Sequence, residues 1–228
     1  MSQDYEEKSR EGPADVSGRR RSRVPYASEC APRLAEVLTH WKAQAPESDD
    51  DSKPVDTIAE QIFAASDRNC AAVMERDSGL PLVAMNDWSN VAVEGGGTGN
   101  HPVVFASGSY EHVPGTTAQL HAEMKLLAYC GEKHIPIGAH IGISKRCCLR
   151  CAVVMKICGH GAKHRGCSGG LWSAGWTIPP FVKSSTALLE AFLGEEVYKW
   201  YLSLGGDDLM TGNNNRADFL SKIQTLKD

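Results

Sequence analysis

Apolar residues recur at helical spacing on both sides of the middle of the chain. In residues 31–44, Leu34, Val37, Leu38 and Trp41 lie three or four positions apart, which predicts an amphipathic helix. Residues 55–77 carry a similar pattern and predict a second helix, and residues 184–205 predict further helices. We therefore expect helical segments before and after the central part of the chain.

The central part has a different hydrophobic pattern, with short apolar runs bounded by turn residues. Residues 80–87 and 101–108 predict strands joined by a glycine-rich turn, and residues 140–145 predict another strand. Residues 116–133 predict a helix that is capped by Thr116 or Thr117 and ended by Gly131. Helix is also predicted for residues 147–161, and one or two more strands for residues 163–170 and 175–181. Strands that alternate with helices indicate an α/β fold, with helices packed on a sheet.

These patterns divide the chain into four parts. Residues 1–24 are polar, contain the basic run of residues 18–23, and predict a disordered N-terminal arm. Residues 31–77 form a helical N-terminal extension, residues 80–182 the α/β core, and residues 183–228 a C-terminal helical extension. The core holds the residues with recognisable chemistry.

The composition is that of an average globular protein, with 42% hydrophobic and 23% charged residues among 228. The sequence has no apolar stretch of about 18 residues and no apolar region of a secretory signal near its start. We expect an intracellular protein, cytoplasmic or nuclear, that does not associate with a membrane. Export by a route that reads no such signal stays open.

The cysteines favour a metal site over a disulfide framework. Three of the eight lie close together, as Cys147, Cys148 and Cys151. Adjacent cysteines in a long chain without a secretory signal are typical of metal binding or of reduced thiols. Cys30, Cys70 and Cys130 are expected to be small buried hydrophobic residues.

Charge is unevenly distributed. The whole chain has a formal net charge of −4, but residues 121–165 contain eight basic and two acidic residues. A basic surface on an acidic protein can bind a polyanion. Solvated charges without a partner are the alternative.

Two short motifs indicate one catalytic metal site. His121, Cys148 and Cys151 supply three ligands of the kinds that zinc prefers, which leaves a fourth position for water. The two cysteines start a predicted helix, whose N-terminus favours thiolates. Glu123 is close to His121 and can move protons from the zinc-bound water to a substrate.

The motif His121-Ala-Glu123, followed by Cys148-Leu-Arg-Cys151, resembles the cytidine deaminase-like superfamily, whose signature is H-x-E…P-C-x-x-C. The phrases LHAEMKLL and IGISKRCCLRC resemble a branch of predicted nucleic-acid deaminases from fungi and from bacterial effector or toxin proteins. The likeness covers roughly residues 80–181. One departure is that Cys147 replaces the proline before the first cysteine, which makes Cys147 a rival to Cys148 as a ligand.

The resemblance implies a three-layer α/β sandwich, with a mixed sheet of about five strands and helices on both faces. It implies Zn²⁺ held by His121, Cys148 and Cys151, and Glu123 as the catalytic proton carrier. The implied reaction is hydrolytic deamination, in which zinc-bound hydroxide attacks C4 of cytosine. The expected substrate is cytosine in single-stranded nucleic acid, and a free nucleoside or nucleotide, or adenine, is the alternative.

Candidates for contacting the substrate are polar or aromatic residues near the ends of predicted strands: Asn86, Trp88, Lys145, Trp172 and Trp176. A non-catalytic alternative is a closed structural zinc site made by Cys148, Cys151, His160 and His164, with Cys158 as a further ligand. In that case the protein would be a binding module. The oligomeric state cannot be read from the sequence.

Overall fold

The computed structural model describes residues 26–45, 52–66, 69–87, 110–114, 119–171, 176–205 and 214–226. Several sequence predictions lie outside these residues: the N-terminal arm of residues 1–24, the strand at residues 101–108, the caps Thr116 and Thr117, and the candidate residues Trp88 and Trp172.

The described part of the chain contains a mixed sheet of four strands. They are β1 (Ala71–Met74), β2 (Leu82–Met85), β3 (Glu111–His112) and β4 (Ile141–Ile143), in the spatial order β3-β2-β1-β4. Strand β1 is antiparallel to both β2 and β4, whereas β2 and β3 run parallel. The strands predicted near residues 80–87 and 140–145 are therefore confirmed.

Strand β1 is buried on both faces, and this explains one wrong prediction. Ala71 and Val73 belong to the core under one face of the sheet, and Ala72 and Met74 to the core under the other. A strand covered on both faces is apolar throughout and shows no alternation. The predicted helix over residues 55–77 therefore holds only for its first half, where α2 spans Pro54–Ala65.

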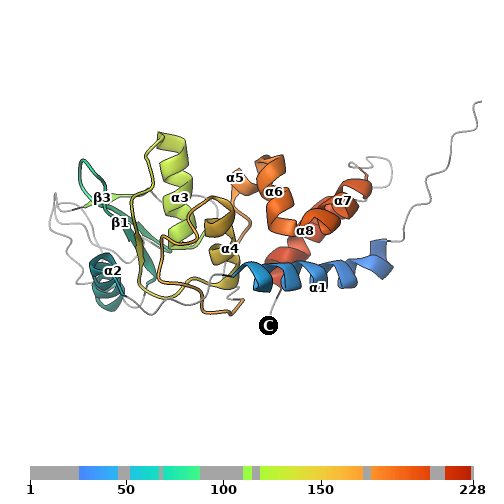
Figure 1. The fold of residues 1–228 in the computed structure, drawn as a ribbon, viewed down its shortest axis with the longest axis horizontal. Helices are drawn as coiled ribbons and strands as arrows, with labels where there is room; N and C mark the ends of the chain where they lie inside the picture. The colour runs from blue at the N-terminus through green and yellow to red at the C-terminus, as the bar shows by residue number, and fades with distance from the viewer. Residues whose placement is uncertain are drawn as a thin grey trace, which may run out of the picture.

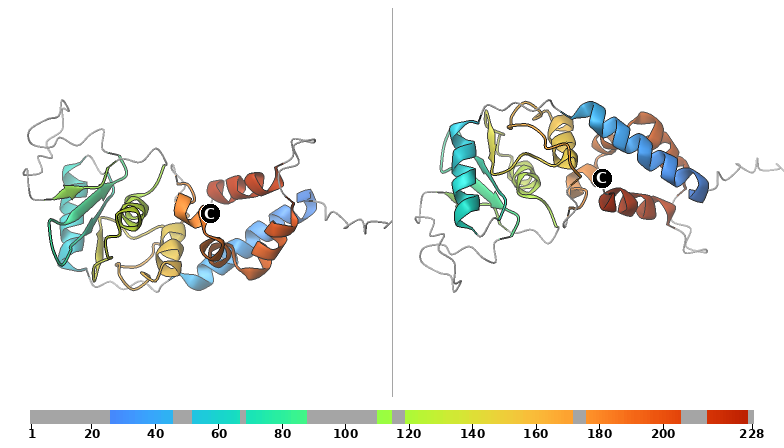
Figure 2. Two further views of the ribbon diagram at one scale, coloured as in Figure 1. Left: turned by 90° about the horizontal axis from the view of Figure 1, so that it is seen from above. Right: turned by 90° about the horizontal axis from the view of Figure 1, so that it is seen from below.

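Helices cover both faces of the sheet, as an α/β sandwich requires. Helix α2 packs against β1 and β4, and α3 (Ala122–Lys133) packs against β1 and β2. Figure 2 shows α2 and α3 on opposite sides of the strands. Helix α4 (Leu149–Ile157) contributes to the same core as α3. The expected sandwich is confirmed, but the described sheet has four strands rather than five.

One or two further strands were predicted in residues 163–170 and 175–181. In the described part of these segments, the only β-bridge is a single parallel one between Cys147 and Cys167. The backbone N–H of Ile141 also donates to the carbonyl of Lys163. This segment thus lies beside β4 without becoming a regular strand.

The remaining helices gather at the end of the molecule away from the sheet (Figure 1). They are α1 (Tyr26–Gln44), α5 (Pro180–Ser184), α6 (Thr186–Leu193), α7 (Glu195–Ser203) and α8 (Asn215–Thr225). Helix α1 contacts α4, α6, α7 and α8, so the N-terminal and C-terminal helices form one group. The indole N–H of Trp41 in α1 donates to the carbonyl of Phe192 in α6 over 2.7 Å. The helices predicted at both ends of the chain are confirmed.

Helix α3 begins and ends later than the sequence suggested. Its N-cap is His121, and the helix continues through Gly131 to Lys133. His134 then adopts a left-handed conformation with φ 54°, and its N–H reaches the carbonyls of Cys130 and Gly131. The left-handed cap falls on a histidine, although glycine is the usual residue there. The expected end at Gly131 is therefore wrong.

The carboxylate of Asp56 ties α2 to β4. It is fully buried and accepts hydrogen bonds from the backbone N–H groups of Lys53 and Ile143, each over 2.9 Å, while His140 Nε2 lies 3.0 Å away. The two elements approach so closely that a Cβ atom at Gly142 would lie 2.2 Å from the carbonyl oxygen of Val55. Asp56 thereby fixes the strand that leads into the Cys148 region.

No helix in the described ranges is long and apolar enough to cross a membrane.

Asp56→Ala should lower the free energy of unfolding by about 3 kcal/mol, because the change leaves the buried N–H of Ile143 and the N–H of Lys53 without their charged acceptor. Glu60→Ala is the control on the same helix. Glu60 is half exposed and pairs with Arg165, so its loss should cost less than about 1 kcal/mol. Urea unfolding of the two variants measures the difference. Equal destabilisation would contradict this role of Asp56.

Candidate metal centre and deaminase site

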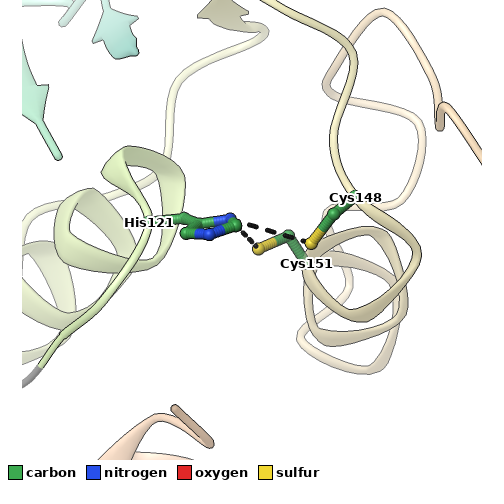
Figure 3. A group of neighbouring side chains, drawn as sticks. All are labelled: His121, Cys148 and Cys151. Carbon is green, nitrogen blue, oxygen red and sulfur yellow. Dashed lines mark hydrogen bonds between the residues drawn. The ribbon is translucent and has the colours of Figure 1, made fainter. Parts of the chain in front are cut away.

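Two helix N-termini converge at the centre of the candidate site. His121 is the N-cap of α3 and Cys148 is the N-cap of α4, with Cys151 in the first turn of α4. Both caps have extended backbones, so their side chains leave the helices at the N-terminal ends. Figure 3 shows the imidazole of His121 facing the two sulfur atoms. The helix predicted for residues 147–161 thus carries the cysteine pair where the sequence placed it.

The distances in this cluster fit a shared tetrahedral ion. His121 Nδ1 lies 3.5 Å from Cys151 Sγ and 3.7 Å from Cys148 Sγ. Zinc bonds of about 2.0 Å to nitrogen and about 2.3 Å to sulfur, at the tetrahedral angle, separate the two ligand atoms by roughly 3.5 Å. The three ligand atoms all lie within 4.8 Å of one another. One imidazole and two thiolates therefore suit zinc and leave a fourth position open.

Electrostatics favours negative charge on this cluster. Hydrogen bonds with Cys151 and with His121 together lower the pKa of Cys148 to about 6, against the effect of burial. Burial raises the pKa of Cys151. Burial also lowers the pKa of His121, but the hydrogen bond with Cys148 and the charge of Glu123 outweigh it and raise the pKa overall. A metal ion would replace the protons that this group holds without it.

Glu123 lies beside the candidate metal ligands. It occupies the first turn of α3, two residues after His121, and only 4% of its surface is exposed. It lines the same cavity as His121 and Cys148. Burial, followed by the charge of Glu123, raises the pKa of the neighbouring Cys147 thiol. Cys147 therefore stays protonated beside the carboxylate.

The cavity beside the cluster has a volume of about 210 Å³. It is lined by Cys70, Asn86, His121, Glu123, Ile143, Lys145, Arg146 and Cys148. Two of the five candidate substrate contacts, Asn86 and Lys145, are thus at this cavity. Arg146 follows Lys145 directly, and both side chains are exposed. Lys145 and Arg146 thus line the same cavity as Glu123.

The sequence motifs did not indicate three of the lining residues, Cys70, Ile143 and Arg146. Cys70 was expected to be a buried hydrophobic residue, but it is partly exposed at the cavity. It precedes β1, and its carbonyl accepts a hydrogen bond from the N–H of Asn86 after β2. Recognition of β1 as a strand would have placed these two residues side by side.

Asn86 is held in one orientation. Its side-chain Oδ1 accepts from the first helical N–H of α3, that of Ala122, over 2.7 Å. The ammonium group of Lys125 donates to the backbone carbonyls of Met85 and Asn86, at 2.9 and 2.6 Å. The amide group Nδ2 of Asn86 is consequently directed away from Ala122.

Trp176 was a candidate for contacting the substrate, but it does not line the cavity. It is buried, with 2% of its surface exposed, and it is absent from the residues that line the cavity. Its indole N–H donates to Cys151 Sγ over 3.3 Å. Trp176 therefore contacts the metal-binding cluster rather than the space for a substrate.

The rival ligand sets do not assemble. Cys147 Sγ lies 3.8 Å from His164 Nδ1 and is outside the group formed by His121, Cys148 and Cys151. His164 Nδ1 accepts from the N–H of Gly166, and His160 lines a separate cavity. Within the described ranges, neither histidine joins the cysteine pair. The geometry thus contradicts the finger-like zinc site.

The basic segment of residues 121–165 is not one continuous surface. Lys125 and Arg150 are buried, and Arg165 pairs with Glu60. Lys163 donates to the carbonyl of Ile137. The charges that remain at the site are therefore fewer than the sequence suggested.

Comparison with known proteins agrees with this geometry. Residues 120–180 match the model of a protein family described as OTT_1508-like deaminase. No curated protein and no solved structure matches the chain significantly. The matched segment contains the ligand-forming His121, Cys148 and Cys151 together with Glu123. The family match and the assembled motif support a cytidine deaminase-like domain, of the predicted nucleic-acid deaminase type, in this segment of the chain.

Proposed function

We propose that the protein is a zinc-dependent hydrolase that deaminates cytosine in single-stranded nucleic acid. The observation that carries the proposal is one cavity that joins the His121 and Cys148 ligands to Glu123, Lys145 and Arg146. It combines a metal site, a proton carrier and two cations within reach of one small substrate group.

The chain's own residues account for the proton transfers. When bound, zinc supplies the Lewis acidity that makes water a nucleophile near neutral pH. The Glu123 carboxylate, held in the first turn of α3, would take one proton from the attacking water and deliver it to the ring nitrogen, and would then take the second proton of that water and deliver it to the departing amine. Its burial limits exchange of that proton with solvent.

The size and charge of the cavity favour a base that is attached to a phosphate backbone. A volume of about 210 Å³ is below the range of roughly 300–1,000 Å³ that holds a whole drug-sized ligand. A single base would enter, while its sugar and phosphates stay outside. Lys145 and Arg146 are exposed at this cavity and would meet those phosphates. The Nδ2 group of Asn86 is a hydrogen-bond donor for the sugar or the base.

Glu123→Gln should retain zinc and lose at least about a hundredfold in turnover, because the amide cannot carry the proton. The zinc-loaded protein is incubated with a cytosine-containing single-stranded oligonucleotide and, separately, with free cytidine. Mass spectrometry detects conversion to uracil or uridine.

Conversion of the oligonucleotide alone, lost in the variant, is the expected result. Conversion of cytidine alone would overturn the nucleic-acid substrate. Turnover that survives in Glu123→Gln would remove Glu123 from the reaction. If neither cytosine substrate reacts, the same assay with adenine in the oligonucleotide tests the other base.

Cys148→Ser should lose zinc during competition with a chelator, whereas Cys147→Ser should retain it. The reason is that only the first change removes a sulfur that faces His121 Nδ1. Metal analysis of the two folded variants after dialysis gives the stoichiometry. Zinc loss from Cys147→Ser together with zinc retention in Cys148→Ser would reverse the ligand assignment.

Lys145→Ala combined with Arg146→Ala should weaken oligonucleotide binding and reduce its dependence on salt. Each lost phosphate contact should lower the slope of log K against log salt by about 1. Binding is measured by fluorescence anisotropy in the Glu123→Gln background, so that no substrate is consumed. Lys199→Ala is the control, because Lys199 is exposed on α7 and pairs with Glu195 and Glu196. An unchanged slope in the double variant would contradict the proposed contacts.

A further inference from the structure

A hydrogen bond reaches the metal-binding cluster from outside the cavity. The indole N–H of Trp176 lies 3.3 Å from Cys151 Sγ, and both residues are buried. Groups that donate to a metal ligand fix its orientation and tune how strongly it donates to the metal. An N–H group that points at a thiolate is such a donor.

The ring of Trp176 is held in place by a buried cation. The Arg150 guanidinium lies 5.2 Å from the centre of the Trp176 ring, in the geometry of a cation–π contact. Arg150 stands between the two cysteine ligands in the sequence, and its side chain is fully buried. The ring of Phe192 in α6 stacks on Trp176 with the centroids 6.1 Å apart.

Arg150 in turn depends on the C-terminal helix. Its Nη2 group donates to the carbonyl of Ile223 over 3.2 Å and to the carbonyl of Leu226, at the end of α8. The backbone next to Trp176 is bound to the same helix, because the N–H of Ile178 donates to Gln224 Oε1 over 3.1 Å. The C-terminal end of α8 thus holds both the arginine and the segment that carries the tryptophan.

We propose that Trp176 is a positioning residue of the metal centre, and that Arg150 and the end of α8 hold its indole N–H on Cys151. The C-terminal helices, which lie outside the segment matched to the deaminase family, would thereby set the properties of the zinc ligand. The inference rests on the metal-binding part of the proposed function and not on the identity of the substrate.

The chain offers a matched control in Trp41. Trp41 is also fully buried, lies 6.0 Å from the Arg150 guanidinium, and contacts Phe192 at 4.9 Å between ring centroids. Its indole N–H donates to the carbonyl of Phe192 and not to a sulfur. Trp41→Phe and Trp176→Phe therefore remove the same atoms from the same buried group, but only the second removes the bond to Cys151.

The test replaces zinc with Co²⁺, whose absorption reports on its sulfur ligands. In Trp176→Phe the thiolate loses a hydrogen bond and becomes more electron-rich. The sulfur-to-cobalt charge-transfer band should therefore move to longer wavelength. Cobalt affinity should fall roughly tenfold, because the hydrogen bond no longer fixes the orientation of the sulfur. Trp41→Phe should keep the wild-type band and affinity. A Trp176→Phe spectrum identical to that of the wild type, or an equal shift in both variants, would overturn the proposal.

Arg150→Lys tests the second half of the proposal. Lysine keeps the charge but lacks the planar guanidinium group that stacks on the ring and donates from Nη2 to two carbonyls. We expect a shift in the same direction as for Trp176→Phe. An unchanged band in a folded Arg150→Lys protein would exclude Arg150 from this role.

A measurement on the unaltered chain covers the case in which a variant does not fold. The protein is loaded with an NMR-active cadmium isotope, and the indole N–H signals are examined for scalar coupling to the metal across the N–H···S bond. Coupling at one indole N–H supports the proposal. Its absence from all five tryptophans would overturn it. Failure of the wild-type cluster to bind cobalt or cadmium would overturn the metal site itself, and so is distinguishable from a metal site without the tryptophan bond.

Discussion

The site depends on the meeting of two helix N-termini. Helices α3 and α4 begin at His121 and Cys148, and the two caps bring an imidazole and two thiols within bonding distance of one ion. The helix dipole makes both ends electropositive, which favours thiolates. The same geometry places Glu123 in the first turn of α3, beside the ligands. The candidate metal site and the position of Glu123 beside it therefore both follow from where these two helices start.

Contacts with the rest of the fold fix the positions at which α3 and α4 begin. On one side, Asn86 at the end of β2 accepts the first N–H of α3, and Lys125 fixes the backbone of Asn86. On the other side, Asp56 joins α2 to β4, the strand that leads towards Cys148. Behind α4, Arg150 connects the cysteine segment to α8. Strand β2, the pair formed by α2 and β4, and helix α8 thus each position one part of the cluster.

Much of the fold was readable from periodicity, and the two failures have separate causes. The amphipathic helix α1 has one buried and one solvated face, so Val37 and Trp41 stood out in the sequence. Strand β1 is buried on both faces, and its short apolar run after α2 looked like more helix. The end of α3 at His134 was missed because a left-handed cap does not require glycine when the helix carbonyls accept its N–H. For β1 the elements packed on its two faces, and not the local sequence, decided the structure.

By itself the sequence determined the donor chemistry: one histidine, a cysteine pair at helix spacing and a glutamate two residues from the histidine. These residue types and spacings are local, and local spacing follows from helix geometry. Only the tertiary structure chose Cys148 over Cys147, separated His160 and His164 from the cysteines, and turned Trp176 from the cavity to the Cys151 sulfur. It also buried Lys125 and Arg150, and so reduced the basic segment to the cations at the cavity. These outcomes depend on which surfaces pack together, because burial and side-chain direction come from contacts between residues that are distant in the chain.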